Sequence, residues 1–376
     1  MKVATIIGTR PEIIRLSRVM AALDRHFEHI IIHTGQNYDY ELNEIFFKQL
    51  EIRKPDYFMD SAGKSAAETI GNVIAKADSL LSKEKPDALL VLGDTNSCLA
   101  VISAKRLKIP IFHMEAGNRC FDLRVPEEIN RKIVDHTSDI NLTYSEHARR
   151  YLMAEGIRPE TIIVTGSPMR EVLEYYRDKI DASDIVERMK LDIGKYFVVS
   201  AHREENIESE TNFNDLIETL NALSESYGMP IIVSTHPRTR KRLENLPEAV
   251  KLDQRINFLK PLGFLDYVRL QMGAFCVLSD SGTITEESSI LDFPAVTIRQ
   301  AHERPEGMDE GVLIMCGLKK DRVVEAVKIV TDQVTGNKRL FRMVSDYRSK
   351  NVSEKVVRII PSYTDYVNRI VWQKAL

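Results

Sequence analysis

Three carboxyl groups of the sequence occupy positions that structural roles explain poorly. Asp94 closes the apolar run ALLVLGD, Glu115 follows IFHM, and Glu127 opens PEEINR, where Pro126 starts a helix. Taken singly, Asp94 could cap a helix, and Glu127 could form an ion pair with Arg131 at i+4. If the three converge on one cleft at the ends of strands, their mutual repulsion would raise their pKa values, which suits general acid and base catalysis.

Cationic residues follow the first apolar run, in the turn GTRP (8–11). Pro11 suits the first turn of a helix, so Arg10 would lie beside the free backbone N–H groups of its N-terminus, a natural site for a phosphate. Arg15 lies little more than one turn further along. Both arginines could instead be solvated or paired with a carboxylate.

A second anion site is predicted in DSGTITEE (280–287). Ser281 and Gly282 expose backbone amides at the start of a helix, whose positive end favours an anion. Glu287, acceptor-only when ionised, could bind both hydroxyls of a ribose. His202, in AHREE, could orient a phosphate or move a proton, although a lone histidine after a strand is more often simply hydrogen-bonded.

These polar clusters follow β-branched runs that alternate with helical patterns, which is typical of parallel sheets with crossover helices. Ligands of open α/β sheets bind outside the carboxyl ends of the strands, where the clusters fall. The predicted strands cover residues 2–7, 30–34, 88–92, 110–113, 139–143 and 161–165, and then 196–200, 230–234, 255–259, 274–278 and 294–298.

The length of 376 residues predicts two domains, because domains usually hold about 100 to 200 residues. We expect an N-terminal Rossmann-like domain at 1–170, a C-terminal Rossmann-like domain at 171–361, and a helix at 362–376 that packs back on the first domain. The net charge of −3, with 43% hydrophobic and 28% charged residues, speaks against nucleic-acid binding. Neither a membrane-spanning run nor a signal peptide is recognisable, so a cytoplasmic location is expected.

Cofactors are not predicted. The four cysteines form no C-x-x-C pair, and the nine histidines show no H-E-x-x-H spacing, so no metal site is indicated. The first turn lacks a G-x-G-x-x-G fingerprint, and no acidic residue follows the second strand where an NAD ribose would need one.

Eight segments taken together closely resemble the non-hydrolysing UDP-N-acetylglucosamine 2-epimerases: GTRPE, GDT, H-x-EAG-x-R, PEE-x-NR, HRxE, HP, DSG-xxx-EE and ERPE, in that order over nearly the whole chain. The resemblance implies a GT-B fold, in which two Rossmann-like domains hold UDP in an interdomain cleft, without metal or NAD, in a homodimer. It implies catalytic roles for Asp94, Glu115, Glu127, Arg131 and His202, and substrate or UDP binding by Arg10, Arg15, His202, His236, Ser281, Gly282, Glu287 and Arg304.

The family mechanism accounts for several carboxylates. The proton on carbon 2 is not α to a carbonyl, so the family eliminates UDP across C1 and C2 to give a glycal and then adds UDP back with the proton on the opposite face. A base and an acid must therefore address opposite faces of the sugar, while cations and helix termini stabilise the departing UDP.

Four departures from the ordinary branch of this family bear on which sugar is the substrate. Arg15 replaces a lysine, GQNYDYELN (35–43) replaces a G-Q-H segment, AGNRCFDLRVPEE (116–128) replaces a longer loop, and His302 replaces a threonine or similar residue. They resemble the branch that converts UDP-2-acetamido-2,6-dideoxy-L-talose to UDP-N-acetyl-L-fucosamine for capsule or O-antigen. We expect that substrate, with UDP-GlcNAc/UDP-ManNAc as the alternative.

Three other classes remain open. A GT-B glycosyltransferase would share the nucleotide-binding features but would use an acceptor surface and a single base. A hydrolysing epimerase would let water reach the glycal. A non-enzymatic nucleotide-sugar sensor would need no acidic cluster.

Overall fold

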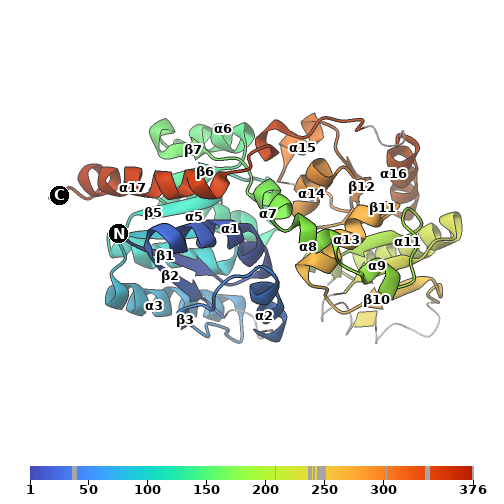
Figure 1. Ribbon diagram of the computed structural model, residues 1–376, viewed down its shortest axis with the longest axis horizontal. Helices are drawn as coiled ribbons and strands as arrows, with labels where there is room; N and C mark the ends of the chain where they lie inside the picture. The colour runs from blue at the N-terminus through green and yellow to red at the C-terminus, as the bar shows by residue number, and fades with distance from the viewer. Residues whose placement is uncertain are drawn as a thin grey trace. The chain divides into compact units, whose positions relative to one another are not determined.

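The computed structural model describes residues 1–35, 40–207, 209–235, 239, 242–243, 251–301, 303–334 and 339–374. The chain divides into two compact units, each with its own sheet (Figure 1). Unit 1 comprises Met1–Tyr175 and Asp346–Leu376, and unit 2 comprises Tyr176–Ser345.

Unit 1 is built on a parallel sheet of seven strands among the described residues. The strands are β1 (Lys2–Ile7), β2 (Glu28–His33), β3 (Tyr57–Phe58), β4 (Ala88–Leu92), β5 (Ile111–Ala116), β6 (Ile140–Thr143) and β7 (Ile162–Val164). Their order is β3-β2-β1-β4-β5-β6-β7, and every pair is parallel. The strands of this sheet are almost entirely apolar and buried, as expected when helices cover both faces.

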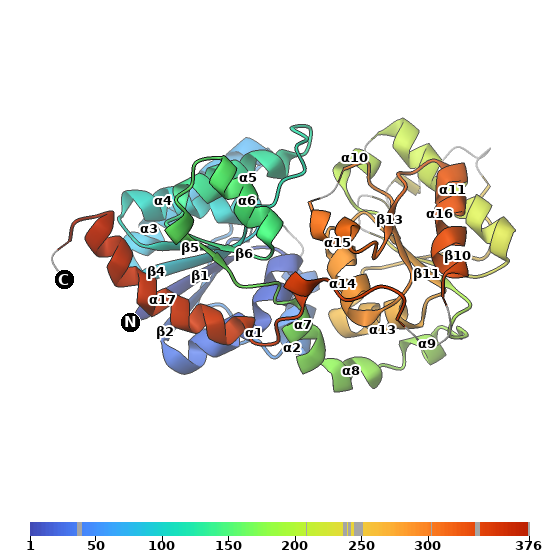
Figure 2. The ribbon, with the colours of Figure 1, turned by 90° about the horizontal axis from the view of Figure 1, so that it is seen from above.

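Helices connect these strands and cover the sheet (Figure 2). They are α1 (Arg10–His26), α2 (Tyr40–Gln49), α3 (Ala66–Glu84), η1 (Asn96–Ala100), α4 (Val101–Arg106), α5 (Pro126–Thr137), α6 (Glu146–Ala154), η2 (Pro159–Thr161), α7 (Met169–Tyr175) and α17 (Val352–Ile370). In α1 the apolar positions Ile13, Leu16, Met20 and Leu23 recur at helical spacing and are fully buried. On the other face of the sheet, α3 and α4 close a second core.

Unit 2 repeats this plan with six described strands in the order β10-β9-β8-β11-β12-β13. The strands are β8 (Phe197–Ser200), β9 (Ile231–Ser234), β10 (Ile256–Leu259), β11 (Cys276–Ser279), β12 (Ala295–Thr297) and β13 (Ile314–Met315). The helices are α8 (Arg177–Asp181), α9 (Ile185–Arg188), α10 (Glu204–Ile207), α11 (Glu210–Tyr227), α13 (Phe264–Gly273), α14 (Thr283–Leu291), α15 (Pro305–Asp309) and α16 (Lys320–Asp332), and η3 (Ser345–Tyr347) follows at the unit boundary. One core packs α11 and α16 on the sheet, and the other packs α9, α13 and α14.

The predicted fold class is confirmed, because both units are Rossmann-like α/β domains with parallel sheets, as in GT-B proteins. Each predicted strand is present, and β3 and β13, of two residues each, were missed because so short a run carries no periodicity. The predicted division differs at 171–175, where α7 continues to Tyr175 in unit 1, and at 346–361, which the structure also places in unit 1. The reason for the second difference is that α17 is one continuous helix with Pro361 inside it, and it packs along α1 (Figures 1 and 2).

The order of both sheets determines where a ligand can bind. Successive strands lead in one direction from β1 to β3 and in the other from β4 onward, and unit 2 does the same at β8 and β11. The crossover helices therefore leave on opposite faces at these two places, which opens a crevice beyond the carboxyl ends of the strands.

Candidate active site

In unit 1, the sequence-predicted carboxylates Asp94 and Glu115 both lie at the carboxyl end of the sheet. Asp94 follows β4 at the switch point, and Glu115 belongs to the neighbouring β5. A Cβ placed on Gly93 would lie 3.7 Å from Glu115 Oε2, so the glycine turn and this carboxylate are in van der Waals proximity. The structure thus brings two of the three predicted acid/base residues together.

Glu115 has an unusual backbone conformation. Its φ is +64°, and the register of β5 against β6 shifts between Met114 and Ala116, so Glu115 is the extra residue of a β-bulge. A positive φ costs a residue with a side chain about 1 kcal/mol or more, and such strain collects at functional sites. The bulge directs the side chain into an ion pair with Arg15, and Asn118 Nδ2 donates to Oε1 at 3.2 Å.

Asp94 is held by Arg131 of α5. Nε and Nη2 of the guanidinium lie 2.8 and 2.7 Å from Asp94 Oδ2, and Arg131 is 4% exposed. Asn130 of the same helix donates to the Asp94 carbonyl at 2.9 Å. Arg131 therefore fixes the orientation of Asp94, and the supporting catalytic role predicted for it stays a prediction.

The third predicted carboxylate, Glu127, lies half-buried in the first turn of α5. Its neighbour Glu128 pairs with Arg131 Nη1 at 2.7 Å. Burial raises the pKa of Glu128, but the Cys120 amide and the Arg131 guanidinium outweigh it and hold that pKa below its usual value. Sequence reasoning missed Glu128 because the run PEE does not tell which glutamate turns inward.

Glu12 is a further carboxyl that sequence reasoning missed. It is 1% exposed, accepts the backbone amides of Gly8 and Thr9 at 2.5 and 2.8 Å, and accepts the hydroxyl of Thr95. Burial raises its pKa to about 7, and the charge of Asp94 adds to the rise although the three hydrogen bonds oppose it. A proton can therefore reside on Glu12 at neutral pH, beside the predicted acid/base pair. In the sequence, Thr9 and Glu12 form a T-x-x-E capping box, a pattern that indicates only the start of a helix.

The same contacts refine the phosphate site predicted at this turn. Glu12 occupies the amides of Gly8 and Thr9, so these two N–H groups are not available to an anion while that contact lasts. Arg10 is the first residue of α1 and is half-buried. Any phosphate contact here depends on the Arg10 side chain, which stays a prediction.

In unit 2, Asp280 organises the switch point between β8 and β11. One oxygen, Oδ2, accepts the backbone amides of His202 and Arg203 at 2.9 Å each and Asn206 Nδ2 at 3.1 Å. His202 Nδ1 lies 3.2 Å from Oδ1, and the imidazole is 43% exposed. The buried aspartate thus locks the turn and presents His202 outward, which is the accessible placement that a phosphate ligand requires.

The neighbouring start of α14 carries the residues of the predicted anion cradle. Gly282 is the N-cap, and Ser281 Oγ accepts the amide of Thr283 at 3.3 Å. Glu287 lies one turn in, is 8% exposed and accepts Gln271 Nε2 at 2.7 Å. Ser281 and Gly282 therefore lie at the start of α14 and Glu287 within it, beside the His202 turn.

Two buried arginines lie beyond this helix. Arg304 precedes α15 and pairs with Glu286 at 3.0 Å, while Arg299 pairs with Glu303 at 2.8 Å. Arg304 is thus a buried, paired cation, and its substrate contact stays a prediction. The predicted residue His236, the departure at His302 and residues 36–39 of the departure at 35–43 lie outside the described residues.

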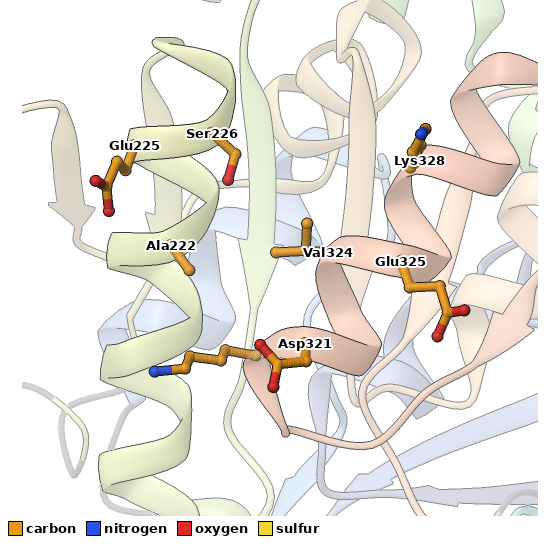
Figure 3. A pocket seen from close by; sticks show the side chains of 8 residues that line it. Ala222, Glu225, Ser226, Asp321, Val324, Glu325 and Lys328 are labelled. Carbon is orange, nitrogen blue, oxygen red and sulfur yellow. The ribbon is translucent and has the colours of Figure 1, made fainter.

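Two observations bear on other kinds of site. In the described ranges no helix is long and apolar enough to cross a bilayer, and no group of three His, Cys, Asp or Glu side chains could hold a metal ion. A shallow groove of about 560 Å³ runs between α11 and α16, lined by charged side chains of both signs (Figure 3). None of the predicted site residues lines this groove, so the groove is not the candidate active site.

Known proteins share this chain's sequence and fold. Residues 21–361 match the family model described as UDP-N-acetylglucosamine 2-epimerase. A UDP-N-acetylglucosamine 2-epimerase structure from Rickettsia bellii has a TM-score of 0.94 and 56% identity, with all of both chains covered. The Methanocaldococcus jannaschii enzyme in complex with UDP-GlcNAc and UDP has a TM-score of 0.90 and 34% identity over 96% of this chain and 100% of that one.

A further relative has a different sugar in its name. The UDP-2,3-diacetamido-2,3-dideoxy-D-glucuronate 2-epimerase of Pseudomonas aeruginosa is 33% identical over 362 residues, which cover 93% of this chain and 100% of that protein. Relatives over nearly the full length thus share the epimerase reaction while their named sugars vary. The chain belongs to the UDP-N-acetylglucosamine 2-epimerase family and is an isomerase.

Proposed function

We propose that this enzyme inverts carbon 2 of a UDP-linked N-acetylhexosamine by eliminating and re-adding UDP. The observation that carries the proposal is the convergence of Asp94 and the bulge residue Glu115 at one switch point, each ion-paired with a buried arginine. The full-length relative that binds UDP-GlcNAc and UDP supports the substrate class.

In the proposed reaction, a carboxylate removes the proton from C2 while the C1–O bond to UDP breaks, which leaves a C1=C2 glycal and UDP. A protonated carboxyl on the opposite face then returns a proton to C2, and the β-phosphate oxygen of UDP re-forms the bond to C1. Glu12, with its pKa of about 7, can exchange a proton near Asp94 between these steps. Atoms balance without a redox partner.

UDP binding is assigned to unit 2. The outward His202, the Ser281–Gly282 start of α14 and the buried Glu287 form the group that would hold the diphosphate and the ribose. Arg10 and Arg304 are the proposed additional cations. Their charge stabilises UDP as it leaves, which is where a transition-state interaction accelerates the reaction.

For the sugar, we propose UDP-2-acetamido-2,6-dideoxy-L-talose, converted to UDP-N-acetyl-L-fucosamine. The loop 116–128 is linked to Asp94 through Arg131, because the amides of Cys120 and Phe121 donate to Glu128, and Glu128 pairs with the guanidinium that holds Asp94. Phe121 and Leu123 of this loop are 71% and 68% exposed. Apolar side chains at that place suit the C6 methyl of a 6-deoxy sugar better than a hydroxymethyl group.

UDP-GlcNAc is the second candidate, supported by the names of the family and of the Rickettsia bellii protein. Parallel assays of the two UDP-sugars, with C2 inversion followed by NMR, decide between them. We expect kcat/KM to be at least about tenfold higher for the 6-deoxy-L-talo sugar. An equal or reversed preference would reject it in favour of UDP-GlcNAc. The homodimer, the cytoplasmic location and the role in capsule or O-antigen synthesis stay predictions.

A further inference from the structure

A buried polar network lies behind the two carboxylates, on residues that the proposed reaction does not use. Its members His113, Arg119 and Asp135 are each 1% exposed. Burying a charge is costly unless it is paired, and here each charged group has a partner. The network ends at Glu155, which binds Arg119 through two hydrogen bonds of 2.8 and 2.6 Å and is 26% exposed at its side chain.

Asp135 of α5 is the centre of this network. Its Oδ2 lies 2.7 Å from Arg119 Nη1, and both of its oxygens lie 3.2 Å from the backbone amide of Gly117. Its Oδ1 lies 2.9 Å from His113 Nδ1. Gly117 comes two residues after the bulge residue Glu115, so Asp135 holds the chain immediately beyond the bulge.

His113 connects Asp135 to the backbone of Gly93, the residue before Asp94. Its Nε2 lies 2.8 Å from the Gly93 carbonyl oxygen, and a carbonyl oxygen can only accept, so Nε2 is the donor of this hydrogen bond. The Gly93 amide in turn donates to the Met114 carbonyl at 3.0 Å. Gly93, which directly precedes Asp94, is therefore clamped to β5 through both of its backbone polar groups.

We propose that His113 and Asp135 are positioning residues that fix the backbone carrying Asp94 and Glu115 in one catalytic geometry. The inference rests on the proposed acid/base roles of those two carboxylates. A strained conformation such as φ +64° at Glu115 persists only where its surroundings over-determine it, and Asp135 supplies that restraint through Gly117. Errors of about 1 Å in such a geometry cost about a hundredfold in rate.

Two substitutions at His113 separate positioning from simple core packing. The amide of His113→Gln reaches the Nε2 position and can still donate to Gly93, whereas the amide of His113→Asn reaches only the Nδ1 position. In the full-length enzyme we expect His113→Asn to lower kcat about tenfold or more with KM changed less than about twofold, and His113→Gln to stay within about threefold of wild type.

The released intermediate gives a readout that loss of folded protein cannot mimic. A displaced Asp94 slows the re-addition step, so His113→Asn should release more free UDP per C2 exchange event than wild type or His113→Gln. This ratio does not depend on the concentration of active enzyme. Equal ratios and equal kcat values in the two variants would overturn the inference, whereas absence of C2 exchange in the wild type would reject the proposed function itself.

A second pair of substitutions, at more exposed residues, tests the inference if His113→Asn does not fold. Glu155→Gln removes one charge at the partly exposed end of the network, and Glu146→Gln makes the same change at the other end of α6, where Glu146 pairs only locally with Arg149. We expect Glu155→Gln to raise the UDP release ratio at least about twofold and Glu146→Gln to leave it unchanged. Equal ratios in these two variants would likewise overturn the inference.

Discussion

The buried carboxyl of Glu12 makes the stability of unit 1 depend on pH. Its pKa is about 7 in the folded protein and about 4.5 for a solvated glutamate, so the folded state binds the proton more tightly. Its favourable contribution is complete below about pH 4.5 and disappears as the pH rises through about 7. Between about pH 5 and pH 8 the free energy of unfolding should fall by about 2.5 kcal/mol from this group alone.

Glu12→Gln removes the titration while keeping the size of the side chain. The protein's single tryptophan, Trp372, lies in unit 1, so its fluorescence follows urea unfolding of that unit. The difference in unfolding free energy, wild type minus Glu12→Gln, should drop by about 2.5 kcal/mol from about pH 5 to pH 8. The exposed Glu44 of α2 gives the control substitution Glu44→Gln, for which we expect no such drop. A difference that is flat or rises with pH would refute the reasoning.

Three further predictions concern the switch points. Arg131→Met removes both donors to Asp94 Oδ2 and should lower kcat about a hundredfold, with Arg131→Lys recovering little; an unchanged kcat would contradict the role of Arg131. Gly117→Ala should destabilise unit 1 by about 3 kcal/mol, because φ at Gly117 is +81° and the new Cβ would lie 2.5 Å from a backbone carbonyl oxygen. The control Gly156→Ala has a similar φ of +87° but open space around the new Cβ, so it should cost about 1 kcal/mol. Equal urea midpoints for these two variants would show that the close approach is irrelevant. Asp280→Ala should weaken UDP binding about tenfold to a hundredfold by calorimetry, because it frees the His202 turn, and an unaltered Kd would remove that turn from the UDP site.

Strand-end clusters were the part of the site that the sequence could predict. Asp94, Glu115, His202 and Ser281 all follow or close a buried β-branched run, and parallel strands bring such residues to one edge of a sheet. The strand order that pairs β1 with β4 and β8 with β11 is a tertiary property. This strand order depends on pairing between strands that are distant in the sequence, so no local sequence pattern predicts it.

Other features depend on tertiary contacts and could not be predicted. A positive φ at a glutamate has no local signature, so the bulge at Glu115 was invisible in IFHMEAG. Glu12 and Glu128 resembled ordinary helix-start acids, and only packing shows that they are buried. Likewise, the predicted boundary at 361/362 falls inside α17, because this helix runs from Val352 to Ile370 with Pro361 within it.

The central claim is that the proton on C2 exchanges while UDP leaves and returns. The most direct test incubates the full-length enzyme with the UDP-sugar in deuterated water and follows C2 by NMR and UDP by chromatography. We predict deuterium at C2 of both epimers, with the UDP linkage retained, and loss of this exchange in Asp94→Asn and Glu115→Gln. Inversion without deuterium, stoichiometric release of free sugar and UDP, or full exchange in both variants would contradict the account.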